Sequence, residues 1–362
     1  MKTVRIITIA CWVVAAMALA GLAIWFLSGT VFGIGSSKLF AGLGAGFRFE
    51  NLTGPYEEVG SYSVPSGNVG SLNIDWVAGE INVTPYDGSD IQITEFAQRA
   101  LQDDEMLSYS ASGGTLTVKF TERNFRTIGN IVQKKLDVLV PRELSESMNR
   151  FEISSTSGAV NVSDMSAQTF KVATVSGEAN LRNISSQKLT ISSTSASIKV
   201  DSAVSDEMSI KTVSGSINVS GTAAKMLSCG STSSSQTISG AFDDADLSSI
   251  SGKIEIDNSA QASSLKVDTT SGAIEASGQY DSATLDSTSG RVTISSAIVP
   301  SSLKVRTISA AIKITVPDEG AITVRHSSTS GKLSSDIPVT LQNSNARFNL
   351  SSTSGNVNIH KY

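Results

Sequence analysis

Two glutamates could perform acid/base chemistry. Glu255 and Glu275 occupy the same position in successive sequence repeats, close in the pattern to Lys253 and Arg291. A pair of neighbouring carboxyl groups can act as acid and base on a glycosidic bond. However, the expected outward positions of the repeats contain no aromatic residue on which a sugar ring could stack. The sequence therefore favours interleaved surface charge, with polysaccharide cleavage as an alternative.

A denser group of carboxylates is formed by Asp243, Asp244 and Asp246. Hard cations such as calcium prefer carboxylate oxygens. The surrounding sequence lacks the glycine- and aspartate-rich nonapeptides of calcium-binding β-rolls. We expect a solvated loop between two repeats here, and the sequence leaves cation binding open.

The chain contains two histidines, His326 and His360, and two cysteines, Cys11 and Cys229. These numbers exclude multi-histidine zinc sites and argue against a Ser-His-Asp triad. Cys11 lies in an N-terminal apolar run, so no disulfide framework is expected. The repeat pattern places His326 and Cys229 at inward positions too far apart to share a metal. We predict no catalytic residue, no metal site and no cofactor.

Apart from Cys11, these residues lie in an array of repeats, whose motif dominates the last two thirds of the chain. The unit is apolar-x-apolar-x-[ST]-x-Ser-[GAS]-x-apolar-x-apolar, and its serine recurs every 18 to 24 residues, most often every 19. A position that accepts only glycine, alanine or serine indicates a tight corner. We predict structural corners at Ser157, Gly158, Ser176, Gly177, Ser214, Gly215, Ser251, Gly252, Ser271, Gly272, Ser289, Gly290, Ser330, Gly331, Ser354 and Gly355.

Apolar residues alternate on both sides of each corner, as in Phe151/Ile153 before it and Val160/Val162 after it. A period of two is typical of strands with one buried face. The sequence predicts an all-β fold, a parallel β-helix or β-solenoid of about eleven coils of ~19 residues that pair in register. The corner serines fall on the inward alternation, so we expect a buried ladder whose hydroxyls bond to one another or to backbone groups of the corner. A nucleophilic role would need a base near each serine, and the sequence supplies none.

An apolar stretch covers residues 6–27 and follows two basic residues. A helix of this length can span a bilayer. We expect an uncleaved transmembrane anchor in residues 1–28, with the N-terminus in the cytoplasm and the remaining chain exported. A cleaved secretory signal is the alternative, because Ala18-Leu19-Ala20 resembles a cleavage site. Residues 29–60 are rich in glycine and serine and are predicted to form a tether.

Residues 61–141 differ from the repeat array, although Ser71 to Val83 resembles one irregular coil. We predict that this region is an N-terminal β cap, which shields the edge of the first coil. Residues 142–362 would then form the solenoid. Its last coil, at Ser354, has no cap and would form the exposed far edge.

The net charge of -5 is modest, and acidic and basic residues are interspersed. A nucleic-acid-binding protein would need a basic stripe to neutralise phosphates. We therefore predict no nucleic-acid partner.

The pattern resembles a family of bacterial envelope proteins with a β-strand-repeat domain of unknown function, often labelled "putative adhesin". The resemblance rests on the apolar segment 6–27, the strand Leu136-Asp137-Val138-Leu139-Val140-Pro141, and Ser-Gly repeats such as Ile153 to Val162. It implies single-pass, envelope-anchored proteins, mainly of Gram-positive bacteria, some of which take part in envelope-stress responses. The family supplies no active-site residues.

Three functional hypotheses remain at this point. The leading one is a non-enzymatic cell-surface rod that binds an envelope polymer or another surface protein. The second is a membrane-coupled sensor or regulator of envelope stress. The third is a polysaccharide-active enzyme built on Glu255 and Glu275.

Overall fold

The computed structural model describes residues 48–50, 52–121, 130–340 and 346–362. The chain divides into two compact units, Met1–Arg48 with Asn124–Asn130 and Phe49–Arg123 with Ile131–Tyr362. The predicted anchor and most of the predicted tether lie outside the described residues. Within the residues that are described, no helix is long and apolar enough to span a membrane. The fold below is that of the second unit.

The described chain is all-β, apart from the short helix α2 (Arg142–Ser145) and the 3-10 turn η2 (Ser66–Asn68). Twenty-four of its strands form one continuous sheet, and the short strands β1 (Arg48–Phe49) and β8 (Asn130–Ile131) form a two-stranded sheet. The sheet strands that precede α2 are β2 (Glu57–Pro65), β3 (Ser71–Trp76), β4 (Gly79–Tyr86), β5 (Asp90–Ala97), β6 (Ser108–Ser112), β7 (Thr115–Lys119) and β9 (Lys134–Pro141).

The repeat array follows α2 and contains long, bent strands in its middle. Its first strands are β10 (Met148–Ser155), β11 (Ala159–Thr174), β12 (Ala179–Ser193), β13 (Ile198–Asp201), β14 (Val204–Thr212), β15 (Ile217–Ser231), β16 (Gln236–Ser249), β17 (Ile254–Thr269) and β18 (Ile274–Ser287). The remaining strands are β19 (Val292–Ser296), β20 (Ser302–Thr307), β21 (Ile312–Val316), β22 (Ile322–Ser328), β23 (Leu333–Ser335), β24 (Val339–Thr340), β25 (Arg347–Ser352) and β26 (Val357–Lys361).

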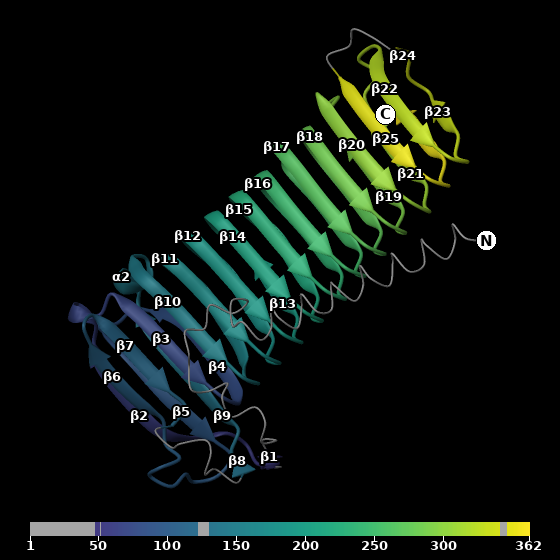
Figure 1. The fold of residues 1–362 in the computed structure, drawn as a ribbon. Coiled ribbons are helices and arrows are strands. Elements are labelled where there is room, and N and C mark those ends of the chain that lie inside the picture. The colour runs from purple at the N-terminus through teal and green to yellow at the C-terminus, as the bar shows by residue number, and fades with distance from the viewer. Residues whose placement is uncertain (1–47, 51, 122–129, 341–345) are drawn as a thin grey trace. The chain divides into compact units, whose positions relative to one another are not determined.

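The strand β11 shows how one coil is built. Its first half pairs with β4, and its second half pairs with β10. Both halves pair in parallel with β12 at an offset of 19 residues, as in Val160 with Ala179 and Phe170 with Leu189. Successive coils therefore stack like with like, in the register that the sequence predicts. Figure 1 shows them as the row of arrows that runs from teal to light green.

The inward side chains of both halves of each coil form the core. Ile153 and Val160, which lie on either side of one corner, are both fully buried. The rings of Phe151 and Phe170, in neighbouring coils, stack with their centroids 4.3 Å apart. Because the same apolar columns continue along the array, each coil is stabilised mainly by the coils on either side of it.

A second bend, opposite the Ser-small corner, was not recognised in the sequence. It contains residues in the left-handed region at a spacing of 19: Asp164 (φ 58°), Asn183 (φ 52°), Ser202 (φ 56°) and Gly221 (φ 57°). Asp, Asn and Gly tolerate this conformation better than other residues do. The Asn183 amide also donates to the Asp164 carboxylate at 2.7 Å. The recurrence of these residue types at the coil spacing was the signal for this bend.

At the N-terminal end of the array, the coils are not stacked in chain order. β3 and β4 pair in parallel with β10 and β11 on one side, and with the later strands β7 and β9 on the other. Beyond this layer the pairing becomes antiparallel, in β2–β5, β5–β9 and β6–β7. These antiparallel strands lie mostly within residues 61–141, where the sequence predicts a cap, but β2 begins at Glu57, in the segment predicted as a tether.

The order is also exchanged at the C-terminal end, and this corrects the prediction for the last coil. β25 and β26 pair with β20 and β21 on one side and with β22 and β23 on the other. The coil at Ser354 is therefore an interior layer, and the coil at Ser330 lies outside it. In Figure 1 the yellow β25 lies between β20 and β22.

The polarity of the inward side chains explains why these two coils exchange places. The coil of β25 and β26 contributes Phe348, Leu350, Val357 and Ile359 to the core, and all four are buried. The coil of β22 and β23 places His326 in the same inward column, where it is only half-buried. An interior layer must be apolar toward both neighbours, so the coil with the polar side chain takes the end position.

Candidate functional site

The Ser-small corner is the most regular feature of the array, and its geometry corrects one expectation. The residue two places before the corner serine, such as Ser155 or Thr174, is buried, whereas Ser157 is half-buried and Ser176 is exposed. The Thr174 hydroxyl accepts from the Gly177 N–H at 2.9 Å and donates to the Gly177 carbonyl at 2.8 Å. The expected burial of the corner serines is therefore wrong, because the chain turns before the serine and the alternation ends there.

The corner serines bond to the backbone of a neighbouring coil. Ser157 Oγ donates to the Val77 carbonyl at 3.0 Å, and Ser176 Oγ donates to the Thr156 carbonyl at 3.3 Å. The same contact recurs at Ser214, Ser251, Ser271, Ser330 and Ser354. At the Ser289 corner, the backbone N–H of the serine donates to the carbonyl of Thr270 at 3.0 Å.

The small residue after each serine lies against the backbone of the neighbouring coil. A Cβ added to Gly215 would lie 1.7 Å from the Ala196 carbonyl oxygen, and one added to Gly177 would lie 1.9 Å from that of Gly158. Similar approaches of 2.0 Å or less occur at Gly252, Gly272, Gly290, Gly331 and Gly355. Where the column contains Ala196, Ser234 or Ala310, the corners in both neighbouring coils are glycines. Each Cβ in this column is thus accommodated between two residues without one.

We expect Gly215→Ala to destabilise the protein by about 2–3 kcal/mol, the cost typical of overpacking. The variant would place a Cβ in three successive coils, between Ala196 and Ser234. Gly158→Ala is the matched control, because a Cβ there meets no atom closer than 3.0 Å. Urea unfolding of both variants checks the expectation, and equal losses of stability would contradict it.

The glutamate pair that suggested acid/base chemistry is bridged by a lysine. Lys253 Nζ lies 2.7 Å from Glu275 Oε2 and 3.1 Å from Glu255 Oε2. Hydrogen bonds to Glu275 and then to Glu255 raise the pKa of Lys253. All three side chains are at least two-fifths exposed. The cluster is thus a cation shared by two solvated carboxylates, as the sequence favoured.

The aspartate cluster lies within strand β16, not in the expected loop. Asp243 and Asp246 are exposed, and Asp246 pairs with Lys266 at 3.3 Å. A register shift between Gly240 and Asp244 marks a bulge at this point. Among the residues that the structure describes, no three His, Cys, Asp or Glu side chains are grouped so that they could hold a metal ion.

The structure places His326 and Cys229 in the inward column that the sequence assigned to them. Cys229 is buried, and burial raises the pKa of its thiol, so the thiolate is disfavoured. His326 Nε2 is buried without a hydrogen-bond partner. His360 lies on the outward side of β26 and contacts Asp336 at 3.0 Å.

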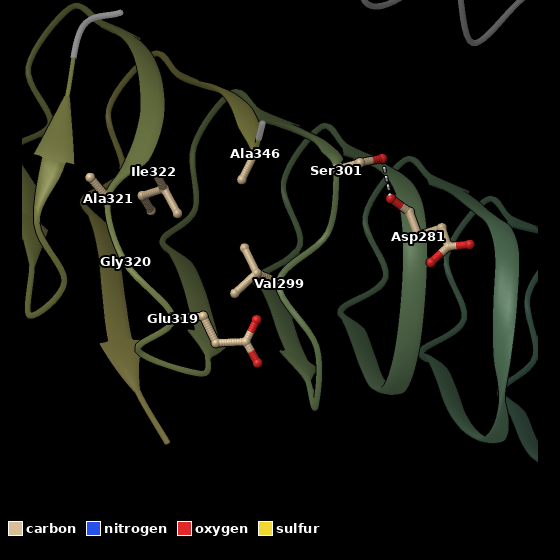
Figure 2. A pocket seen from close by; sticks show the side chains of 8 residues that line it. All are labelled: Asp281, Val299, Ser301, Glu319, Gly320, Ala321, Ile322 and Ala346. Carbon is tan, nitrogen blue, oxygen red and sulfur yellow. Dashed lines mark hydrogen bonds between the residues drawn. The ribbon is translucent and has the colours of Figure 1, made fainter. Parts of the chain in front are cut away.

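A cleft of about 720 Å³ lies at the C-terminal end of the array. It is lined by Asp281, Val299, Ser301, Glu319, Gly320, Ala321, Ile322 and Ala346. Figure 2 shows Asp281 and Ser301 on one side of the cleft and Glu319 to Ile322 on the other. The repeat pattern does not predict this cleft, because the exchanged order inserts the layer of β25 between the coil that contains Ser301 and the coil that contains Ile322.

A family model described as Toastrack DUF4097 matches the chain twice, over residues 69–235 and 207–360. The chain belongs to the toastrack family. The resemblance drawn from the Ser-Gly repeats and the strand that ends at Pro141 is thereby confirmed. The first match begins before β3, so the family pattern includes the coil of β3 and β4 as well as the later array.

Several solved structures are similar to this toastrack chain. A "putative adhesin" from Parabacteroides merdae is 12% identical, with 71% of this chain and 92% of that chain covered and a TM-score of 0.44. A "putative adhesin" from Bacteroides fragilis is 13% identical, with coverage of 88% and 100% and a TM-score of 0.27. A "putative lipid binding protein" from Parabacteroides distasonis is 14% identical, with coverage of 84% and 97% and a TM-score of 0.36. No curated protein matches the chain.

A buried ion pair between β5 and β9, which the sequence did not predict, lies near the N-terminal end of the toastrack array. Lys134 Nζ lies 2.6 Å from Glu95 Oε1, and the two side chains are 1% and 0% exposed. The ammonium also donates to the carbonyls of Glu105 and Phe120 and lies 3.9 Å from the centroid of the Phe120 ring. The Glu95 carboxylate accepts from the Leu107 N–H. Burial lowers the pKa of Lys134 to about 8, although Glu95 opposes this shift.

The Asp75 carboxylate makes the folding stability depend on pH. Its Oδ1 is buried without a hydrogen-bond partner, and burial raises its pKa to about 6, against the effect of Lys119. The unfolded pKa is about 3.9, so between pH 4 and pH 6 the folded state binds more protons, and the contribution of Asp75 to stability falls as the pH rises. We expect Asp75→Asn to gain about 1–2 kcal/mol at pH 7 and almost nothing at pH 4. Urea unfolding at both pH values checks this, and an equal gain at pH 4 would contradict it.

Proposed function

We propose that this toastrack protein is a non-enzymatic, membrane-anchored cell-surface protein whose rod binds an envelope polymer or another surface protein. The observation that supports this best is a file of polar side chains on one outward face, with one residue from each coil in strand register. This polar file consists of Asp137, Asn82, Asn161, Asn180, Lys199, Asn218, Thr237, Glu255, Glu275, Thr293, Lys313, Asn358 and Ser334.

Asparagines at the start of the polar file form a hydrogen-bonded ladder. Asn180 donates to Asn161 at 2.9 Å, Asn161 donates to Asn82 at 2.9 Å, and Asn82 donates to Asp137 at 2.8 Å. The second N–H of Asn161 donates to the Glu80 carboxylate at 3.1 Å. Each amide oxygen accepts at most one ladder bond and has two lone pairs, so the ladder leaves acceptor capacity for a partner. A partner lying along the rod would meet a polar group about every 4.8 Å. This spacing suits an extended polymer or strand.

The anchored orientation is part of the proposal and rests on the sequence. Residues 6–27 are long enough and apolar enough to cross a bilayer, and two basic residues precede them. A rod displayed on the outer side would present the polar file to envelope components. In this proposal, the predicted anchor attaches the rod to the membrane, and the polar file is the binding face.

Polysaccharide cleavage by Glu255 and Glu275 is not part of this proposal. An acid/base pair needs one carboxyl group that stays protonated and is free to approach the substrate. Glu255 and Glu275 instead share Lys253, and each is about half exposed to solvent. A solvated carboxylate held by an ammonium is poorly suited to donate a proton.

Binding of the purified full-length protein to isolated cell-wall polymer, to matrix proteins and to itself tests the proposal. We expect one of these partners to bind, and Asn161→Ala/Asn180→Ala to weaken that binding about tenfold through the loss of two sets of hydrogen bonds. Thr190→Ala/Ser209→Ala, on the outward side of the other strand stack, is the matched control and should leave binding unchanged. No binding to any partner, or equal effects of the two double variants, would refute the proposal.

The anchored orientation has a separate test. Ser263 is exposed on the array, and Ser263→Cys in a Cys11→Ser background provides an accessible thiol, because Cys229 is buried. We expect a membrane-impermeant maleimide to label this cysteine in intact cells. Labelling only after permeabilisation would place the rod on the cytoplasmic side.

A further inference from the structure

We propose that the outward face of β20, β25 and β22 binds a linear chain of phosphodiester groups through three basic side chains. This basic patch consists of Lys304 in β20, Arg347 in β25 and Arg325 in β22, and all three residues are exposed. Figure 1 shows the three strands side by side, with β25 in the middle. The patch lies on the strand stack that does not contain the polar file, so it can be tested separately from the proposed surface function.

The strand register brings the three cations together. Lys304 and Arg325 both lie opposite Asn349, one in each neighbouring layer. Arg347 precedes Asn349 by two residues on the same face of β25, so its Cα lies on the order of 8 Å from those of the other two cations. Arginine and lysine side chains are long enough to approach a shared anion from this distance. The exchanged order of the coils is what places Arg347 in the middle layer.

Cations in earlier layers of this stack are paired with carboxylates. Lys188 Nζ, for example, lies 2.8 Å from Glu207 Oε2. In β20 itself, Arg306 donates to both carboxylate oxygens of Asp286, at 2.8 and 3.0 Å. The outward positions of β20, β25 and β22 contain only basic and uncharged residues. The alternation of opposite charges along this face therefore stops at Asp286.

No carboxylate of the described residues neutralises the basic patch. Their ion pairs include neither Lys304 nor Arg325 nor Arg347. Glu319, which precedes β22, lines the cleft and pairs with none of the three. Like charges on neighbouring strands repel one another, so the patch destabilises the fold slightly. A bound anion would remove this cost, which favours an anionic ligand.

The geometry of the patch favours a phosphodiester chain over other anions. A carboxylate has two oxygens in one plane and suits a single guanidinium, whereas a phosphate presents oxygens in several directions. Lys304 and Arg325 are two layers apart, about 10 Å, so two successive phosphates fit them better than one small anion does. Single-stranded nucleic acid would use aromatic side chains to stack its bases, and the outward positions of these three strands contain none.

The test measures binding of a synthetic glycerol-phosphate decamer to the purified full-length protein by calorimetry, at several salt concentrations. We expect Arg347→Gln and Arg325→Gln each to weaken binding by about three- to fivefold, as is typical of exposed ion pairs. Each substitution should also reduce the slope of the logarithm of affinity against the logarithm of salt concentration by about 1, because one phosphate contact is lost. A purely structural role of the arginines would not change this slope.

Lys188→Gln is the matched control, because it removes one positive charge from the same strand stack at a lysine that is already paired with Glu207. It should leave binding unchanged. Asn161→Ala/Asn180→Ala should also leave it unchanged, which distinguishes the basic patch from the polar file. Thermal unfolding shows whether each variant is folded, and substitutions in the basic patch should not lower the unfolding temperature, because they relieve repulsion.

The proposal is overturned if Arg347→Gln weakens binding no more than Lys188→Gln does. It is also overturned if poly-L-glutamate of equal charge binds as tightly as the decamer, because the patch would then attract any polyanion. Tighter binding of oligothymidylate than of the decamer would indicate a nucleic-acid site instead. Binding to phosphatidylglycerol vesicles that depends on Arg347, without binding of the soluble decamer, would assign the patch to a lipid surface.

Discussion

Truncation after Thr340 is expected to destroy the end of the array instead of trimming its last layer. The truncation removes β25 and β26, which lie between the coil of β20 and β21 and the coil of β22 and β23. Four buried apolar side chains are lost, each of which contributes about 1.5–3 kcal/mol on burial. β22 also loses its pairing with β25, and β23 loses its pairing with β26. Hydrogen exchange should show residues 322–335 unprotected in the truncated protein and protected in the full chain.

A cysteine cross-link checks the exchanged order in the intact chain. Lys313 faces Asn358 in the neighbouring layer, whereas Ser334 lies one layer further away. A disulfide needs Cα atoms within about 7 Å, a distance that one layer of ~4.8 Å satisfies and two layers exceed. In a Cys11→Ser background, we expect Lys313→Cys/Asn358→Cys to cross-link and Lys313→Cys/Ser334→Cys to remain reduced. The opposite result would show that the coils stack in chain order.

Lys134→Met should destabilise the protein by about 3–5 kcal/mol, because it leaves the Glu95 carboxylate buried without its cation. It also removes the donor to the carbonyls of Glu105 and Phe120. Denaturant unfolding of the full-length protein measures the loss. The neighbouring Lys135 provides the matched control, since it pairs with Asp137 at 3.1 Å but both side chains are about 30% exposed. Lys135→Met should cost less than about 1 kcal/mol.

A double variant separates the ion pair from simple packing. Glu95→Gln can still accept a hydrogen bond from the Leu107 N–H, but it carries no charge. Lys134→Met/Glu95→Gln should therefore be more stable than Lys134→Met alone, by about 1–2 kcal/mol. If the double variant were less stable than the single one, the cost of Lys134→Met would lie in lost packing, and the buried charge would not explain it.

The sequence determined the repeat, the strands and the small corner position. A period of two on either side of each corner predicts two strands per coil, and β11 and β12 pair in that register. The requirement for glycine, alanine or serine after the corner serine follows from the approach of a carbonyl oxygen in the neighbouring coil, as at Gly215. These features are local or repeat at a fixed spacing, so a single sequence contains them.

The left-handed bend could be predicted from the sequence only in part. Asp164, Asn183 and Gly221 are residue types that favour φ > 0, and they recur at the coil spacing. Ser202 does not share this preference, and the bends in later coils contain register shifts, as between Asp257 and Gln261. The pattern was thus present in the sequence but irregular enough to be overlooked.

Only the tertiary structure decided the order of the coils at both ends and the contacts that depend on it. Strands of the same apolar pattern are interchangeable in pairing, so the pattern of β22 and β25 alone cannot say which of them is interior. That choice depends on the cost of burying His326 between two layers, compared with leaving it half-exposed at an end. The Lys134–Glu95 pair and the cleft beside Glu319 both depend on this long-range order, which no local spacing encodes.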